Sequence, residues 1–173
     1  MYWYVFFVRT GREERVEKFL KERLNTDVFI PFVPLHEKIF KMANTLKKEL
    51  KPLFPSYVFI ESEMSNQEFM KSIKGLIHNS NDIVHLLKYS DTEIALRESE
   101  RLMLVSLFND DHCIESSSGV IEGDKIYIID GPLKGLESII RKVNRHRRLA
   151  SIEIEFAGDI RLVNVSLEIV EKL

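Results

Sequence analysis

Trp3-Tyr4-Val5-Phe6-Phe7-Val8 is the stretch that decides the fold of the first part of this 173-residue chain. All six residues are aromatic or β-branched, which is the composition of a strand buried on both faces. Gly11 ends the run, and apolar residues then recur at helical spacing from about Glu13 to Leu24. The sequence therefore predicts a buried central strand followed by an amphipathic helix.

Further strands and helices are predicted to alternate over the next eighty residues. Strands are expected over 28–33, 57–61 and 83–87, where β-branched and aromatic residues cluster. Ser65 and Glu68 form a capping box that opens a short helix ending near Gly75. Asp91 or Thr92 is expected to cap a further helix that reaches about Phe108. This alternation predicts an α/β or α+β sandwich.

The composition changes at residues 109–119, where acidic residues, three successive serines and a glycine follow one another. This is linker composition, and helical periodicity disappears after it. Short strands are expected over 125–129, 138–143, 149–156 and 160–165. Such spacing suggests a small five-stranded barrel. We expect an α+β protein with an N-terminal domain at 1–108, a flexible linker at 109–119 and a β-barrel domain at 120–173.

Bulk composition excludes several classes of protein. The net charge is −2 and the hydrophobic fraction is 45%, so a nucleic-acid contact has to come from local clusters of charge. The single cysteine, Cys113, excludes a disulfide framework and a cysteine metal site within the chain. No basic leader and no apolar run of roughly 18 residues is present, so we expect a cytoplasmic protein with no membrane contact.

No constellation of catalytic or metal-binding residues is found. The five histidines are scattered, and there is no phosphate-cradling glycine loop, H-E-x-x-H or G-x-S-x-G. We therefore expect no enzyme activity, no catalytic residue, no cofactor and no metal.

Two segments concentrate positive charge. The segment 141–148 contains Arg141, Lys142, Arg145, His146, Arg147 and Arg148 and no acidic residue. A turn between strands presents such groups together, and the planar guanidinium suits RNA phosphates and bases. The segment 36–51 holds five lysines against two glutamates. In both cases the alternative is a solvated, charged hairpin without a ligand.

Three segments, in order and at matching spacing, resemble the NusG family. They are the strand at Trp3-Tyr4-Val5 with its following helix, the segment Pro52-Leu53-Phe54-Pro55-Ser56-Tyr57-Val58-Phe59, and Gly123-Asp124 followed by Asp130-Gly131-Pro132-Leu133-Lys134-Gly135. The last looks like a KOW motif, in which Gly131 and Gly135 allow positive φ and Pro132 pre-sets the turn. The resemblance implies an NGN-type N-terminal domain and an SH3-like KOW barrel. The second segment and the basic turn look like the specialised RfaH and LoaP antiterminators.

The resemblance implies a polymerase contact through Phe54, Tyr57 and Phe59. In the family, aromatic residues at these positions line a hydrophobic pocket that grips the clamp helices of the RNA polymerase β′ subunit. Large aromatic side chains supply much binding energy in a small area. The alternative is that these residues belong to the core, which carries equal weight for Phe59.

The resemblance also implies nucleic-acid contacts. Lys47 and Lys48 match a hairpin near the upstream DNA, and Arg12, Arg15 and Lys74 match positions facing the non-template strand in RfaH-like proteins. The likeness to LoaP implies that the barrel binds a nascent RNA hairpin. Arg141, Lys142, Arg145, His146, Arg147 and Arg148 would contact this RNA, with Lys134 supporting them.

One departure from the family concerns Phe156-Ala157-Gly158. Ordinary NusG carries an exposed Ile-Phe-Gly turn here that contacts ribosomal protein S10 and the Rho factor, and its phenylalanine falls on Ala157. The leading prediction is thus a monomeric elongation and antitermination factor that binds polymerase and RNA. The alternatives are a general NusG coupled to S10 or Rho and, more remotely, a KOW-type ribosomal or RNA-assembly protein.

Overall fold

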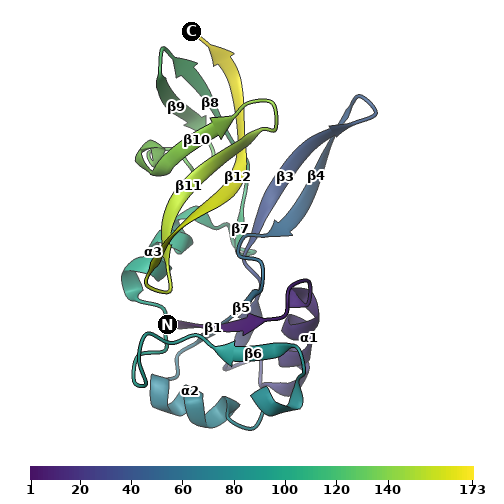
Figure 1. Ribbon diagram of the computed structural model, residues 1–173, viewed down its shortest axis with the longest axis vertical. Coiled ribbons are helices and arrows are strands. Elements are labelled where there is room, and N and C mark those ends of the chain that lie inside the picture. Colours follow the sequence, from purple (N-terminus) through teal and green to yellow (C-terminus); the bar gives the residue numbers. More distant parts are fainter. The chain divides into compact units, whose positions relative to one another are not determined.

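The structure, a computed structural model, describes all 173 residues and divides them into two compact units (Figure 1). The first unit contains Met1–Pro34, Phe54–Arg101 and Phe156–Gly158. The second unit contains Leu35–Leu53, Leu102–Glu155 and Asp159–Leu173. Helices and antiparallel sheet share the first unit while strands dominate the second, so the predicted α+β class is confirmed.

A four-stranded sheet forms the centre of the first unit. Its order is β2(Ile30–Phe32)-β5(Tyr57–Ser62)-β1(Tyr2–Val8)-β6(Ile83–Leu86). β1 lies inside the sheet and pairs antiparallel with both β5 and β6. Trp3 to Phe6 are at most 1% exposed. The predicted buried central strand is confirmed.

Helices α1(Glu13–Arg23) and α2(Asn66–Ile73) pack beside this sheet (Figure 1). Alternate residues of β1 point to opposite faces, so Tyr4 and Phe6 share one face. The ring of Phe69 from α2 stacks on Tyr4 at 3.7 Å between centroids. The Ser65 hydroxyl accepts a hydrogen bond from the Glu68 N–H, and the Glu68 carboxylate accepts one from the Ser65 N–H. The predicted capping box is therefore confirmed, and the short helix η1(Ile77–Asn79) follows it.

The predicted start of the next helix is wrong. Helix α3 spans Glu98–Leu107, whereas a cap had been expected at Asp91 or Thr92. The N–H groups of Thr92 and Glu93 donate to the Ser90 hydroxyl, which makes a local turn instead. The Leu96 N–H donates to the Trp3 carbonyl at 2.8 Å, so the chain runs against the end of β1 before it becomes helical.

No helix of the chain is long and apolar enough to cross a membrane.

A five-stranded sheet dominates the second unit. Its number of strands is the number that the sequence predicted for this part of the chain. Its order is β10(Ile140–Asn144)-β11(Leu149–Phe156)-β12(Asp159–Lys172)-β8(Ser117–Glu122)-β9(Lys125–Asp130). The short helix η2(Glu137–Ile139) replaces the start of the predicted strand at 138–143. Within residues 109–119, β7(Cys113–Ile114) pairs in parallel with the strand that begins at Leu35.

The turn between β9 and η2 depends on Gly131. Its φ is +102°, and a Cβ built on it would lie 2.6 Å from the Cα of Ser117. Leu133 is fully buried, and its N–H donates to the Ser117 hydroxyl. The positive φ that the sequence predicted at Gly131 and at Gly135 is confirmed, and Lys134 is exposed in the turn.

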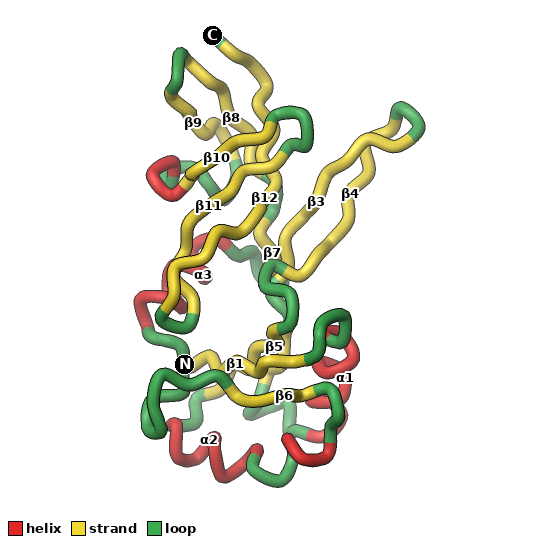
Figure 2. The backbone as a smooth tube through the Cα atoms, viewed as in Figure 1, coloured by secondary structure: helices red, strands yellow, loops and turns green.

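A long hairpin of β3(Leu35–Met42) and β4(Thr45–Pro52) belongs to the second unit (Figure 2). Ala43 and Asn44 connect the strands with φ of 50° and 63°, as a two-residue hairpin turn requires. The Glu37 carboxylate accepts hydrogen bonds from the Ser116 N–H at 2.7 Å and from the Lys48 ammonium at 2.9 Å. Glu37 thus ties the base of the hairpin to the chain that enters β8.

The environment of Glu37 keeps it ionised. Burial alone raises the pKa of Glu37, but the hydrogen bonds from Lys48 and the Ser116 N–H outweigh it and lower the pKa below the ordinary value. A carboxylate with a lowered folded-state pKa stabilises the fold above its unfolded pKa of about 4.3. That contribution is lost as the pH falls through the lower, folded-state pKa.

We expect Glu37→Gln to lower the free energy of unfolding at pH 7, because the amide forms no ion pair with Lys48. The difference from the wild type should shrink as the pH falls below about 4. Urea unfolding of both proteins at neutral and acidic pH measures it. Glu171→Gln, at an exposed position of β12, is the control and should lose less than about 0.5 kcal/mol. An unchanged difference at acidic pH would refute this account of Glu37.

Candidate functional site

The predicted polymerase-binding residues form an aromatic patch on one face of the first unit's sheet. We use this name for Phe54, Tyr57 and Phe59. Tyr57 and Phe59 share a face of β5 because they are two residues apart. Phe54 is 2% exposed and Phe59 is fully buried, whereas Tyr57 is half-buried. The ring centroids of Phe54 and Phe59 lie 6.0 Å apart and nearly parallel. The structure therefore brings the three residues together.

Phe156, at the end of β11, is part of the first unit and lies on the aromatic patch. Its ring stacks on Phe54 with centroids 4.4 Å apart and an interplanar angle of 13°. It also lies 5.7 Å from the Phe59 ring and 5.1 Å from the Tyr57 ring. Phe156 itself is fully buried. Aromatic pairs of this kind each contribute roughly 0.5–1.5 kcal/mol beyond their buried area.

Glu100 holds the two residues that follow Phe156. Its carboxylate accepts hydrogen bonds from the Ala157 N–H at 2.7 Å and the Gly158 N–H at 3.1 Å. The Tyr89 hydroxyl donates to the same carboxylate at 2.9 Å. Burial, together with this carboxylate, raises the pKa of Tyr89, so its hydroxyl remains a donor. Sequence reasoning missed Glu100, because nothing in its helix distinguishes it from an exposed carboxylate.

The predicted DNA-facing residues are divided between the units. Arg12, at the start of α1, and Lys74, after α2, are exposed residues of the first unit. Arg15 pairs with Asp82 at 3.3 Å and keeps 70% of its side chain exposed. Lys47 and Lys48 lie on β4 in the second unit, and Lys48 is engaged by Glu37.

The arginine turn, by which we mean Arg145–Arg148, connects β10 to β11. The Arg147 N–H donates to the Asn144 side-chain oxygen, and the Arg148 N–H donates to the Arg145 carbonyl. Arg148 has a φ of 53°, a left-handed conformation that costs a non-glycine residue roughly 1–2 kcal/mol. Arg145, His146 and Arg147 are exposed. The turn therefore displays its charges to solvent as the sequence suggested.

The remaining predicted RNA-binding residues lie on neighbouring elements. Arg141, on β10, is paired with Glu153 of β11 at 3.0 Å and donates to the Ser138 carbonyl. Lys142 follows it on the same strand and is exposed. Lys134 occupies the separate glycine-bounded turn after β9. Arg141 is thus neutralised within the protein, whereas the arginine turn is not.

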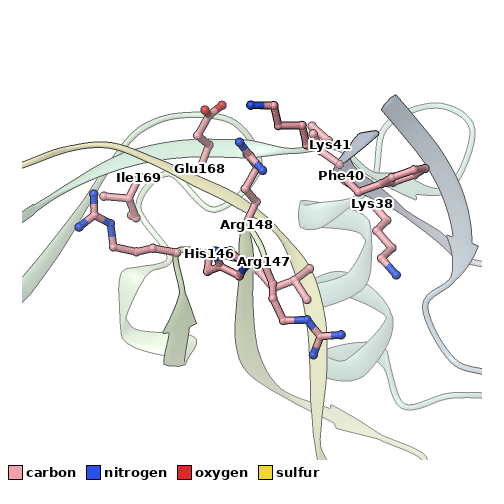
Figure 3. Close-up of a pocket in the computed structure, with 11 residues that line it drawn as sticks. Lys38, Phe40, Lys41, His146, Arg147, Arg148, Glu168 and Ile169 are labelled. Atoms are coloured by element: carbon pink, nitrogen blue, oxygen red, sulfur yellow. The ribbon is translucent and has the colours of Figure 1, made fainter. Parts of the chain in front are cut away.

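A basic cleft of about 840 Å³ lies within the second unit (Figure 3). It is lined by residues 38–41 of β3, residues 145–149 of the arginine turn and the start of β11, and Glu168 and Ile169 of β12. Five permanent cations line it, namely Lys38, Lys41, Arg145, Arg147 and Arg148, against one carboxylate. None of the five takes part in an ion pair of the structure.

Other titratable groups do not assemble a reactive centre. No three His, Cys, Asp or Glu residues are grouped so that they would hold a metal ion. Burial raises the pKa of the Cys113 thiol to about 11, so it stays protonated at neutral pH. Burial also lowers the pKa of His36, which keeps its ring neutral.

Known proteins are similar to this chain in sequence. A family model described as "Transcription termination factor nusG" matches residues 1–104. A Rickettsia bellii protein named "Transcription termination/antitermination protein NusG" is 22% identical over 98% of this chain and 89% of its own length. Proteins of the same name from Thermus thermophilus and Neisseria meningitidis are 22% and 24% identical, over 90% and 99% of this chain and 90% and 97% of their own lengths.

We expect Glu100→Ala to release the segment Phe156–Gly158. The two N–H groups lose a charged acceptor, which costs roughly 1–3 kcal/mol of unfolding free energy. Amide hydrogen exchange, followed by NMR, should show lost protection at Ala157 and Gly158. Glu98→Ala removes a carboxylate that is 62% exposed and paired with Arg101 on the same helix, and it should leave both amides protected. Retained protection in Glu100→Ala would contradict this role of the carboxylate.

Proposed function

Since the chain belongs to the NusG family, whose model matches 104 of its 173 residues, we propose that it is a transcription antitermination factor that binds RNA polymerase and nascent RNA. Members of the family are transcription factors that act with RNA polymerase and are not enzymes. To this family role the proposal adds the specialised function in antitermination and the specific partners. We also propose that the protein is monomeric and cytoplasmic.

The observation that carries the proposal is the arginine turn, whose charges have no partner in the chain. Permanent charges close together repel one another, and an RNA phosphate backbone relieves this repulsion. Arg148 keeps a left-handed φ in which glycine or asparagine would cost less. Unfavourable backbone conformations of this kind concentrate at functional sites. Together these features support RNA binding at the barrel. The bound RNA is a nascent hairpin or the strand that flanks it.

The polymerase contact is proposed at the aromatic patch. Phe54, Tyr57 and Phe59 supply the large aromatic surface that a helix-in-groove contact with the β′ clamp helices needs. Phe156 stacks on this surface in the present structure. Polymerase binding through Phe54 therefore requires Phe156 to leave it. A factor that then binds one polymerase state more tightly than the paused or terminating state shifts the population toward elongation.

Two further contacts belong to the proposal. Arg12, Arg15 and Lys74 of the first unit are proposed to face the non-template DNA strand, where flexible cations hold phosphate without reading sequence. Coupling to ribosomal protein S10 or Rho, as in a general NusG, is the second candidate. The names of the relatives, which include both termination and antitermination, fit a general NusG. The buried Phe156 and the small Ala157 at the turn argue against it.

The RNA contact is tested with the full chain and a labelled leader RNA across a salt series. Contacts of Arg145, Arg147, Arg148 and Lys142 with four phosphates predict a slope of log K against log salt of roughly −3. The variant Arg145→Ala/Arg147→Ala/Arg148→Gly should have a slope closer to −1. Glycine at 148 relieves the left-handed strain, so this variant should not lose stability at that position.

The matched control is Lys18→Ala/Lys125→Ala/Lys172→Ala, which removes the same charge from exposed lysines outside the turn. It should keep the wild-type slope. Absence of RNA binding by the wild type at low salt would remove the RNA half of the proposal and favour the protein-coupling NusG.

The polymerase contact is tested by binding of core RNA polymerase to Tyr57→Ala, Phe54→Ala and Phe156→Ala. The first two should bind at least tenfold more weakly, which corresponds to about 1.4 kcal/mol. Phe156→Ala should bind more tightly, because it uncovers the patch, although it costs roughly 3–5 kcal/mol of stability. A loss of binding in all three variants would mean that destabilisation, and not a lost contact, explains the result.

A further inference from the structure

The basic cleft has two walls that come from parts of the chain a hundred residues apart. Residues 38–41 of β3 form one wall, and the arginine turn forms the other. Both belong to the second unit, and β3 lies beside β12. In Figure 3, Lys41 and Arg148 extend into the same region of the cleft, close to Glu168. The hairpin is therefore part of the arginine turn's surroundings.

The register of β3 explains why Lys41 faces the cleft. Alternate residues of a strand point to opposite faces, so Glu37, Ile39 and Lys41 share one face. Glu37 on that face binds the Ser116 N–H, which turns the face toward the five-stranded sheet. Lys38 and Phe40 occupy the other face of the strand and also line the cleft. The position of Lys41 is thus fixed by a buried contact four residues away.

The charges of the cleft select a polyanion. Five cations and one carboxylate line it, although the whole chain carries a net charge of −2. Several other cations of the second unit are paired with carboxylates, such as Lys48 with Glu37 and Arg141 with Glu153. Cations on both walls, Lys38 and Lys41 on one and the arginine turn on the other, match a series of phosphates.

The apolar residues of the cleft favour a single strand over a duplex. Ile39, Leu149 and Ile169 lie among the cations. Leu46 and Leu50, opposite Lys41 and Glu37 across the hairpin, are 53% and 52% exposed on the same face. A duplex stacks its bases inside and offers a protein mainly its phosphates and grooves, whereas a single strand offers bases as well. A surface with cations beside apolar side chains suits a single strand, which presents both phosphates and unpaired bases.

We propose that the basic cleft binds a single-stranded stretch of nucleic acid, held between the hairpin lysines Lys38 and Lys41 and the arginine turn. This inference rests on the proposed RNA contact and extends it. The β3–β4 hairpin, which the family resemblance assigned to upstream DNA, becomes the second wall of the RNA site. The ligand is recognised by its phosphate backbone and its unpaired bases.

The test uses the full chain, fluorescence anisotropy and three labelled probes, namely unstructured single-stranded RNA, single-stranded DNA of the same sequence, and the RNA as a duplex. Lys38→Ala/Lys41→Ala should reduce the magnitude of the salt slope for the single strands by roughly 1.4, since two phosphate contacts are lost. The matched control Lys125→Ala/Lys172→Ala removes the same charge from exposed residues of the second unit outside the cleft. Its slope should equal that of the wild type.

Glu168→Gln supplies a test that loss of folding cannot imitate. It removes the one carboxylate of the cleft, so single-stranded RNA should bind more tightly at low salt and the advantage should vanish at high salt. Unchanged or weaker binding at low salt would count against the cleft. Preference for RNA over single-stranded DNA would add a 2′-hydroxyl contact, and equal affinity would limit recognition to phosphate and base.

The outcomes separate this inference from the proposed function. If the arginine variant loses binding while Lys38→Ala/Lys41→Ala behaves like its control, the cleft is refuted and the RNA contact of the turn stands. If the wild type binds no RNA, both fail. Tighter binding of the duplex than of the single strand overturns the choice of ligand. Displacement of RNA by polyglutamate at equal charge would overturn it in favour of an acidic protein.

Discussion

The carboxylate of Glu37 is the contact on which the basic face of the second unit depends. It ties β3 to the chain entering β8 through the Ser116 N–H and engages Lys48 of the opposite strand. Because strand faces alternate, fixing Glu37 also fixes the direction of Lys41. An exposed two-stranded hairpin is marginally stable alone, so its orientation needs such a contact. The buried carboxylate of Glu37 therefore determines where Lys38 and Lys41 lie relative to the arginine turn.

The sequence predicted those features whose signals are local. The apolar run at Trp3–Val8, the capping box at Ser65 and the glycine turn at Gly131 each carry their cause within a few residues. The start of α3 could not be predicted in this way, because Asp91 and Thr92 are good caps in isolation. A backbone hydrogen bond from Leu96 to Trp3 outweighs them, and that partner lies far away in the sequence.

The residues of the candidate site also differ in whether local sequence or long-range contacts reveal them. The arginine turn is visible in the sequence because its charges are contiguous, and the aromatic patch is visible because of the family resemblance. The roles of Glu100 and of Lys38 and Lys41 cannot be read from the sequence, because the residues near which they lie are more than fifty positions away. Charge patterning gave the region of Lys38 and Lys41 a basic character, but only the fold associates these lysines with the arginine turn.

Arg148 and Ala157 are two of the six non-glycine residues with positive φ, and they lie at the two proposed binding regions. Each conformation costs roughly 1–2 kcal/mol, and something nearby has to offset it. At Ala157 the Glu100 carboxylate does so, by accepting the N–H groups of Ala157 and Gly158. At Arg148 the offset is smaller, since its carbonyl only accepts the Leu167 N–H and its N–H closes the turn. The arginine turn keeps more of its strain and all of its charge in the free protein, and the polyanion that we propose as its ligand relieves the repulsion among those charges.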